Sequence, residues 1–184
     1  YLEKPMTVLA NNKEAVIIRY FQLADTPQLS VYLNSLSAAT RQRFAPHGFD
    51  EASIIRLYEH PSAHIGFVAC TQAHELIGYA VLQIGHQPHE AERFTSYGVQ
   101  TDALTDCSFA PSVADKWQSS GIGSAMMPFI INEMKKFGMK RMFLWGGVQA
   151  TNEKAIHFYR KYQFQQIGMF EYNGANLDMI RMLI

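Results

Sequence analysis

The stretch from Val113 to Ser124, V-A-D-K-W-Q-S-S-G-I-G-S, constrains the fold of this chain more than any other segment. It lies between a run predicted as a strand and a run with helical spacing, so it predicts a strand-to-helix junction. The first amides of a helix lack an intrahelical partner and carry positive dipole character, so they bind phosphate without a cationic side chain. Gly121 and Gly123 have no Cβ and let a ligand approach the backbone closely. The segment therefore indicates a phosphate-binding loop.

Two other glycine-rich motifs fit this segment poorly. A P-loop requires Gly-Lys-Ser/Thr at its end, whereas the chain has Gly123-Ser124-Ala125. A dinucleotide-binding fingerprint requires Gly or Ala where Met126 stands, and normally lies in the first strand-helix unit. Taken alone, the two glycines would be better explained by tight packing of the helix on the strand.

Hydrophobic periodicity predicts alternating strands and helices. Strands are predicted at 14–23, 64–71, 76–84, 103–113, 140–148, 164–172 and 177–184. Helices are predicted at 25–36, 37–44, 50–59, 119–137 and 151–162, and a loop at 85–101. The predicted buried face of the long helix consists of Ile122, Met126, Ile130, Met134 and Phe137. Asp25 and Thr151 are predicted N-caps and Gly138 a C-cap. The order predicts one α/β domain over residues 1–184, with a mixed sheet whose central strands are parallel across the long helix.

Composition excludes several classes of protein. Hydrophobic residues make up 48% of the chain, too many for a disordered one. The 16 basic and 16 acidic residues balance and form no basic stripe, which argues against nucleic acid as a partner. No segment approaches the roughly 20 apolar residues that span a bilayer, so no membrane partner is expected. Cys70 and Cys107 lie far apart and are interpreted as small core residues, which fits the cytoplasm.

Two motifs together resemble a known family. Gln118-Ser119-Ser120-Gly121-Ile122-Gly123 matches the Gln/Arg-x-x-Gly-x-Gly/Ala signature of the GCN5-related N-acetyltransferases (GNAT). The segment from Asn152 to Phe164 is similar to the family's Asn-x-x-Ala-x-x-x-Tyr-x-x-x-Gly-Phe helix, with Gln163 in the usual glycine position. The resemblance is strong from about residue 103 to 164, and before that it rests on the order of elements.

The resemblance implies the acyl-CoA N-acyltransferase (GNAT) fold, a mixed, mostly antiparallel sheet with splayed central parallel strands flanked by helices. It implies acetyl-CoA as co-substrate and no metal. In the family the loop amides hold the pyrophosphate, and the pantetheine arm pairs with the fourth strand, opposite which Trp145-Gly146-Gly147 would form a wall. The expected cofactor-binding residues are Ser112, Val113, Ala114, Gln118, Ser119, Ser120, Gly121, Ile122, Gly123, Ser124, Asn152, Ala155, Phe158, Tyr159 and Lys161.

The resemblance also implies catalytic roles. Tyr159 matches the tyrosine that donates a proton to the departing thiolate in many family members, and this role is favoured over the alternative that it packs beside Phe158 as an ordinary helix-face residue. A backbone N–H around Val113 is expected to stabilise the oxyanion. The expected intermediate is tetrahedral, formed by direct attack of an amine.

The general base is left open. Asp106, at the start of the fourth strand, lies where some relatives place a glutamate, but it could be an ordinary polar residue at a strand end. His86, His89 and Glu90 in the preceding loop could also reach the acceptor. A metal site at the two histidines is not expected, because they lack the helical His-Glu-x-x-His arrangement.

The acceptor is expected to be a primary amine of a small molecule or a peptide. In the family the first two helices cover the acceptor pocket, so Arg41, Arg43 and His47 could bind an anionic part of it or could form a solvated basic turn. A non-catalytic acetyl-CoA-binding regulatory domain is the alternative, and a protein-interaction module would not respond to coenzyme A at all. The protein is expected to be a monomer or a homodimer.

Overall fold

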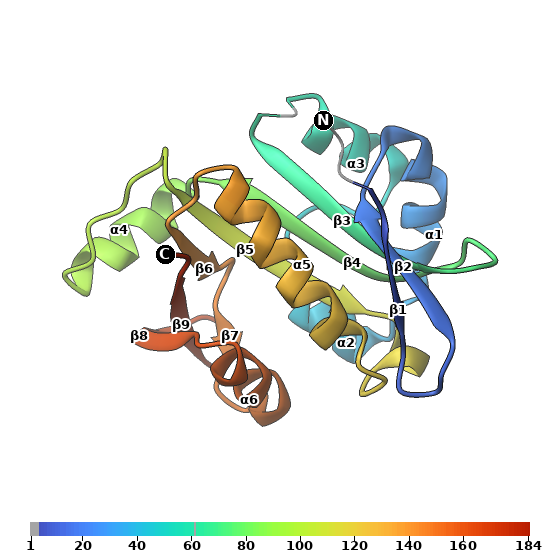
Figure 1. Cartoon of the computed structure of the whole chain (residues 1–184). Coiled ribbons are helices and arrows are strands. Elements are labelled where there is room, and N and C mark those ends of the chain that lie inside the picture. The colour runs from blue at the N-terminus through green and yellow to red at the C-terminus, as the bar shows by residue number, and fades with distance from the viewer. Residues whose placement is uncertain (1–3, 61) are drawn as a thin grey trace. The chain divides into compact units, whose positions relative to one another are not determined.

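The computed structural model describes residues 4–60 and 62–184, and the contacts divide the chain into two compact units. The first comprises the chain up to Leu82 together with Pro111–Asn132, and the second comprises Gln83–Ala110 and Glu133–Ile184. Each unit therefore combines two separate stretches of sequence. Strands β4 (Leu76–Ile84) and β5 (Asp106–Val113) and helix α5 (Ile122–Lys136) run from one unit into the other (Figure 1).

The first unit is built on antiparallel strands in the order β1 (Met6–Leu9), β2 (Ala15–Tyr20), β3 (His64–Thr71) and β4. The registers place Met6 opposite Ile18 and Val16 opposite Thr71. β3 and β4 have the predicted bounds, because both are continuous apolar runs with a polar turn between them. β1 was not predicted, since four residues are too few to show a period.

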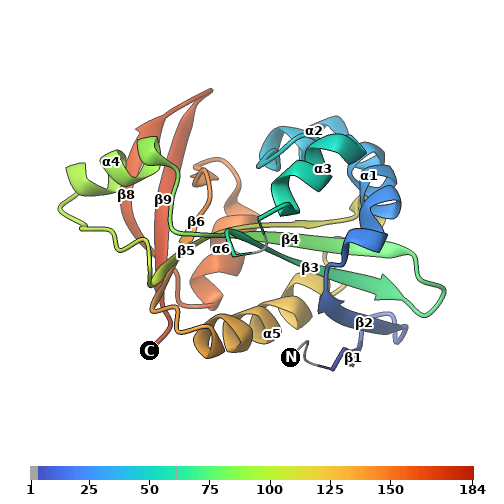
Figure 2. The ribbon, with the colours of Figure 1, turned by 90° about the horizontal axis from the view of Figure 1, so that it is seen from above.

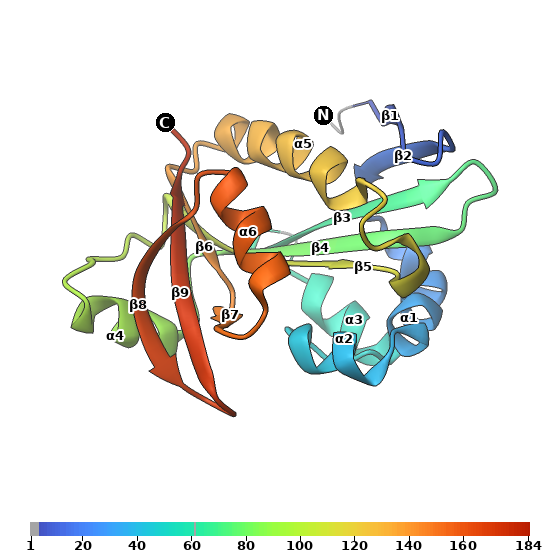
Figure 3. The same ribbon diagram turned by 90° about the horizontal axis from the view of Figure 1, so that it is seen from below.

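Helices lie on both faces of this sheet (Figures 2 and 3). The short helix η1 (Leu23–Asp25), α1 (Thr26–Ser35), α2 (Ala38–Arg43) and α3 (Glu51–Tyr58) lie on one face, and the first part of α5 lies on the other. Ser37 and Asp50 cap α2 and α3, accepting hydrogen bonds from Thr40 N at 3.2 Å and Ser53 N at 2.9 Å.

Asp25 is the N-cap residue of α1, as predicted, but its side chain accepts no hydrogen bond from the amides of α1. Its carboxylate instead accepts from the Arg19 guanidinium at 2.7 and 2.8 Å and from Gln22 N at 2.8 Å. A charged partner from β2 competes successfully with the helix amides, because charge-assisted bidentate pairs are the stronger interaction.

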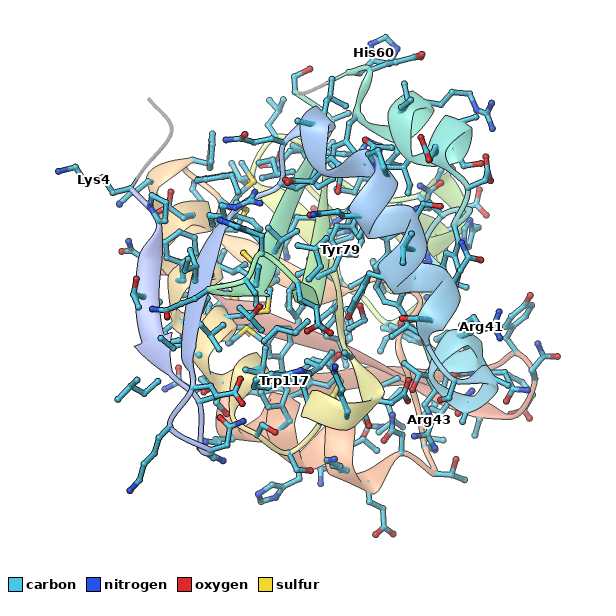
Figure 4. All side chains as sticks on the ribbon, turned by 90° about the vertical axis from the view of Figure 1, so that its right-hand side faces the viewer. Lys4, Arg41, Arg43, His60, Tyr79 and Trp117 are labelled. Carbon is cyan, nitrogen blue, oxygen red and sulfur yellow. The ribbon has the colours of Figure 1, made fainter. Side chains whose placement is uncertain are left out.

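A buried hydroxyl network lies between β4 and the helices that cover it. Tyr79, fully buried and labelled in Figure 4, shares a 2.6 Å hydrogen bond with the Tyr58 hydroxyl and a 3.0 Å hydrogen bond with His47 Nε2. His47 Nδ1 is 2.7 Å from the Gly48 carbonyl, which can only accept, so Nδ1 carries the proton. The neutral ring therefore accepts from Tyr79 through Nε2.

The second unit contains the parallel strand pair. β5 pairs in parallel with β6 (Arg141–Leu144), from Asp106 opposite Arg141 to Phe109 opposite Leu144. β6, β7 (Val148–Gln149) and β8 (Gln165–Glu171) are all antiparallel to β9 (Ala175–Met182). The mixed sheet with a central parallel pair is confirmed, and the β8–β9 hairpin turns at Asn173 and Gly174 as predicted, with φ of 50° and 104°.

Two predictions about the second unit are wrong. The predicted loop 85–101 contains helix α4 (Pro88–Ser96). Its buried positions are Glu90 and Phe94, and a charged residue on the buried face breaks the hydrophobic period that would have predicted a helix. The predicted single strand 140–148 is two strands. Gly146 and Gly147 adopt left-handed φ of 75° and 68°, which ends β6 in a turn.

The long helix matches its prediction except at its end. Ile122, Met126, Ile130 and Met134 are buried, whereas Phe137 is 53% exposed because it lies beyond the last helical residue, Lys136. Gly138 adopts φ of 80°, as expected of a residue that ends a helix.

The remaining features of composition agree with the structure. Cys70 and Cys107 are both buried and unpaired, as expected of core residues. In the part of the chain that the structure describes, no helix combines the length and the apolar character needed to cross a bilayer.

The pH dependence of stability is expected to report on His47. Burial lowers the pKa of His47 below its ordinary value of about 6.5, so the unfolded chain binds more protons than the folded one just below that pH. The stabilisation is therefore complete above about pH 6.5 and is lost as the pH falls toward the folded pKa. His47→Gln should cost about 1 kcal/mol at pH 7.5.

Urea denaturation at pH 7.5 and at pH 5 tests this expectation. The difference in unfolding free energy between wild type and His47→Gln should shrink at pH 5, and titration of the other histidines cancels in that difference. An equal difference at both pH values would contradict a neutral His47 in the folded state.

Candidate functional site

The turn between β1 and β2 holds the carbonyl groups of the predicted phosphate loop. Asn11 N donates to Ser120 O at 2.8 Å, and Asn11 Nδ2 donates to Ser119 O at 3.4 Å. A trans peptide places its C=O and N–H on opposite sides, so the N–H of Gly121, which shares a peptide with the Ser120 carbonyl, points away from Asn11. The loop therefore directs an amide outward instead of a carbonyl.

The loop backbone adopts a conformation that requires glycine at one position. Ser119 and Gly121 have φ of 63° and 87°, in the left-handed region. A Cβ on Gly121 would lie 2.8 Å from Asn11 Oδ1, closer than real Cβ contacts. Ile122 and Gly123 follow in the first turn of α5, where amides have no intrahelical acceptor. Amides at the start of a helix after such a turn form a cradle for an anion.

Side chains of the short helix η2 (Asp115–Trp117) and of the loop connect this cradle to α2. The Asp115 carboxylate accepts from Ser37 N and Ser37 Oγ, both at 2.8 Å, and from Thr40 Oγ1 at 2.7 Å. These hydrogen bonds, that from the Ser37 amide foremost, lower the pKa of Asp115. Gln118 Nε2 donates to Val113 O and to Thr40 Oγ1, each at 3.3 Å. The sequence predicted a helix that begins at Ser37 but did not show the partner of Ser37, Asp115.

The end of β5 has one edge on β4. Ala114 N donates to Ile77 O at 2.8 Å, and Ser112 Oγ donates to Tyr79 O at 3.3 Å. Successive amides of a strand point to opposite edges, so the Val113 N–H points away from β4. β6 pairs with β5 only as far as Phe109, and β5 continues for four residues beyond it. This is the geometry of an edge that can hydrogen-bond an extended ligand.

Tyr159 lies on α6 (Glu153–Lys161), in the second unit. It is 9% exposed, and its ring lies 5.4 Å from the ring of Phe164 and 5.6 Å from that of Phe158. Within the described ranges, no group lies within hydrogen-bonding distance of its hydroxyl. Burial raises the pKa of Tyr159 well above its ordinary value, so the phenol stays protonated. It is a proton donor without an acceptor.

The rest of the second motif shapes α6. Asn152, not the predicted Thr151, is the cap, and its Oδ1 accepts from Ala155 N at 3.3 Å. Lys161 is exposed at the other end of the helix. Gln163 adopts φ of 66°, so the chain makes the turn for which the family uses glycine, at the cost of some strain.

Asp106 has an environment unsuited to a general base. Its fully buried carboxylate accepts from Arg141 at 2.7 and 2.8 Å and from Asp102 N at 2.7 Å, and lies 3.1 Å from His86 Nε2. Burial alone would raise the pKa of Asp106, but the hydrogen bonds from His86 and Arg141 outweigh it and hold the pKa below its ordinary value. The carboxylate is a stable anion in an ion pair, which favours the alternative interpretation of Asp106 as a polar residue at a strand end.

The other candidate bases and the candidate acceptor-binding residues have different surroundings. His86 Nδ1 lies 3.2 Å from Ser108 Oγ, so both ring nitrogens of His86 have partners, and His89 is exposed. Glu90 is buried, and its Oε1 accepts from Gly146 N at 2.6 Å. Arg41 and Arg43 are exposed, at the outer side in Figure 4. His47 does not join them as an anion-binding group, because it is neutral and bound to Tyr79.

Comparisons with known sequences and solved structures agree with the fold described above. The sequence model of a family described as the acetyltransferase (GNAT) family matches residues 31–164. The GNAT domain of S. lividans PAT is 17% identical with a TM-score of 0.75, over 97% of this chain and 96% of that chain. A ribosomal-protein-alanine acetyltransferase from Vibrio fischeri is 15% identical with a TM-score of 0.72, over 98% and 97%.

A ribosomal-protein-alanine N-acetyltransferase from Escherichia coli is 19% identical with a TM-score of 0.62, over 91% of this chain and 94% of that chain. At these identities the solved structures establish the fold. A search of curated proteins by sequence finds no match.

Replacing Asp106 is expected to destabilise the protein strongly. Asp106→Asn leaves the Arg141 guanidinium without its counter-charge and should cost about 3 kcal/mol. Since the folded pKa of Asp106 is lowered, its contribution is present above about pH 4 and is lost as the pH falls through the folded pKa. The unfolding free energy of Asp106→Asn should therefore fall less steeply than that of wild type as the pH is lowered below 4.

Thermal and urea unfolding between pH 2.5 and pH 7 measures both effects. The control is Asp50→Asn, at an exposed cap where Asn serves as well as Asp, and it should change stability by less than about 0.5 kcal/mol. Equal effects of the two variants would refute the structural role of Asp106.

Proposed function

Because this chain belongs to the acetyltransferase (GNAT) family, we propose that it transfers an acetyl group from acetyl-CoA to a primary amine, by direct attack through a tetrahedral intermediate. The observation that carries this proposal is the loop before α5. Its carbonyls are bound by Asn11, and a Cβ at Gly121 would displace the Asn11 side chain, so amides face outward where a helix begins.

The loop is suited to the diphosphate of coenzyme A. In our proposal the amides of Gly121, Ile122 and Gly123 hold the pyrophosphate, with the Ser119, Ser120 and Ser124 hydroxyls in the same stretch. Backbone amides and the helix dipole supply positive character, which fits a chain with no basic cluster in this segment. Ser112, Val113 and Ala114 would pair with the amides of the pantetheine arm. Asn152, Ala155, Phe158 and Lys161 of the second motif complete the proposed set.

Two groups would act on the reacting atoms. The Val113 N–H, which points away from β4, stabilises the developing oxyanion. Tyr159 donates its proton to the departing thiolate. Its protonated hydroxyl supports this role, because a donor without an acceptor in the described chain is ready for one supplied by the substrate.

We propose a peptide or small-molecule amine as the acceptor and the cytoplasm as the location. Two of the similar solved structures are named as ribosomal-protein-alanine acetyltransferases. A peptide that begins with alanine is therefore the first acceptor to test, beside lysine-containing peptides and small amines.

Thermal shift with acetyl-CoA, followed by free-thiol release across this amine panel, tests the function. Amine-dependent thiol release supports it. A shift without thiol release for any amine would favour an acetyl-CoA-binding regulatory domain, and the absence of both would refute coenzyme A binding.

Tyr159→Phe should separate chemistry from binding. The variant keeps the ring that packs on Phe158 and Phe164 but loses the proton, so turnover should fall about 100-fold. The dissociation constant for acetyl-CoA, measured by calorimetry, should stay within about twofold of wild type. Tyr172→Phe is the control, because Tyr172 is 73% exposed, and it should change neither value. Full turnover in Tyr159→Phe would remove this tyrosine from the mechanism.

Gly121→Ala should weaken coenzyme A binding about tenfold or more, since a Cβ would displace Asn11 and turn the loop amides. Gly138→Ala is a matched control. Gly138 also has a left-handed φ, of 80°, but a Cβ there meets nothing within 4 Å. Both variants should lower the melting temperature, and only the first should lose affinity in calorimetry with acetyl-CoA. An equal affinity in both would rule out the Gly121 amide as a phosphate ligand.

A further inference from the structure

Ser112 is a buried serine near the end of β5 whose hydroxyl joins two other elements of the first unit. It is 7% exposed, its Oγ donates to Tyr79 O of β4 at 3.3 Å, and the Tyr32 hydroxyl of α1 lies 3.0 Å from the same Oγ. The Tyr79 carbonyl can only accept, so it takes the single hydroxyl hydrogen of Ser112. Tyr32 therefore donates to Ser112, and the hydrogen bonds run in one direction, from α1 through β5 to β4.

Tyr32 carries a hydroxyl that packing does not require, because phenylalanine would fill nearly the same volume. Its side chain is 4% exposed on the buried face of α1. Along residues 4–60 and 62–184, Ser112 is the only hydrogen-bond partner of this hydroxyl. Burial raises the pKa of Tyr32 well above its ordinary value, so the phenol keeps its proton and acts as a donor. A buried hydroxyl costs desolvation that phenylalanine avoids, which points to a use for this one at the end of β5.

The backbone that follows Ser112 is anchored at two further points, both within the first unit. Ala114 N donates to Ile77 O of β4 at 2.8 Å, and Gln118 Nε2 donates to Val113 O at 3.3 Å. The peptide that joins Ser112 to Val113 thus lies between the Ser112 side chain and the Ala114 amide. Since successive amides of a strand point to opposite edges, these anchors direct the Val113 N–H away from β4.

The last residues of β5 have less support from strand pairing than the residues before them. The parallel pairing of β5 with β6 runs from Asp106 to Phe109 and ends there. Pro111 has no amide hydrogen and donates no backbone hydrogen bond. Contacts other than this pairing must therefore hold the end of the strand. The hydrogen bond from Tyr32 to Ser112 is such a contact, and it ties the strand end to a helix.

We propose that Tyr32 is a positioning residue for the acetyl transfer, which keeps the Val113 N–H aimed at the oxygen of the reacting thioester by fixing Ser112. This inference rests on the proposed function, in which that N–H stabilises the oxyanion. Tyr32 neither touches the substrate nor exchanges a proton, and it acts by limiting the rotation of one peptide. A donor aimed in advance needs no reorganisation when charge develops on the oxygen, so a loss of alignment lowers kcat and leaves affinity unchanged.

A second buried tyrosine provides a matched comparison. The Tyr58 hydroxyl of α3 shares a 2.6 Å hydrogen bond with the hydroxyl of Tyr79, the residue whose carbonyl accepts from Ser112. Tyr58 is 9% exposed, close to the 4% of Tyr32. Removing either hydroxyl deletes one buried hydrogen bond on the same face of the sheet. Of the two, the Tyr32 hydroxyl is the one bound to the end of β5.

Tyr32→Phe should lower kcat about tenfold, less than the roughly hundredfold loss that follows when an oxyanion donor is removed altogether. With the best substrate of the amine panel, KM for the amine and the dissociation constant for acetyl-CoA should stay within about twofold of wild type. Tyr58→Phe should keep the wild-type kcat, although both variants should lower the melting temperature by similar amounts. A defect of stability alone would not produce this difference between the two variants.

Ser112→Ala tests the same connection from its other end and keeps the backbone of β5. It should lower kcat as far as Tyr32→Phe does, and it replaces that variant should Tyr32→Phe not fold. In a double-mutant cycle, Tyr32→Phe introduced into Ser112→Ala should change kcat by less than about twofold, because the connection is already absent. Two effects that multiply in full would contradict a route through Ser112.

Nuclear magnetic resonance relaxation measures the alignment without turnover. The order parameter of the Val113 N–H should fall in Tyr32→Phe and stay at the wild-type value in Tyr58→Phe. An unchanged order parameter of Val113 in Tyr32→Phe would overturn the positioning role, whatever the activity of the variant.

The outcomes distinguish the two proposals. A wild-type protein that acetylates no amine of the panel would refute the proposed function, and the positioning role with it. An active wild type with the same kcat in Tyr32→Phe as in Tyr58→Phe would refute only the role of Tyr32.

Discussion

The two hydrogen bonds from Asn11 to the carbonyls of Ser119 and Ser120 are the interaction on which the proposed site depends. A loop that binds a diphosphate through its backbone must keep its carbonyls away from the anion. The β1–β2 turn accomplishes this by binding them, and Gly121 has a left-handed φ of 87° and lies so close to Asn11 that an added Cβ would displace its side chain. Asp115 and Gln118 then connect the same loop to α2 and to the end of β5. The cradle is thus pre-organised before any ligand arrives, which lowers the entropic cost of binding.

Two buried acids of the second unit show how burial alone does not define a function. Asp106 is surrounded by donors, and its negative charge belongs to the folded structure. Glu90 receives one short hydrogen bond and is otherwise surrounded by groups that leave its second oxygen unbound within the described chain. Natural folds satisfy most buried polar atoms, and the two carboxylates differ in how fully the described chain satisfies theirs.

Strand endings decide where these groups lie. β6 stops at Leu144 because two successive glycines take left-handed conformations, and the freed amide of Gly146 then meets Glu90. β5 continues past its last partner in β6 and directs the Val113 N–H away from β4. The expectation of a single domain over the whole chain remains a prediction, as do the roles of Tyr159 and the acceptor.

Periodicity and local chemistry determined much of this protein from the sequence by itself: the bounds of β3 and β4, the helix starts at Ser37 and Asp50, the turn at Asn173 and the parallel pair across α5. The two motifs also identified the family, because a helix start and its glycines are encoded within a few residues. Tertiary structure alone decided the surroundings of the buried acids. Asp106 meets Arg141 from 35 residues away, and Glu90 meets Gly146 from 56 residues away. Neither local propensity nor spacing contains those contacts, since burial and hydrogen bonding of a carboxylate depend on the elements that the fold brings beside it.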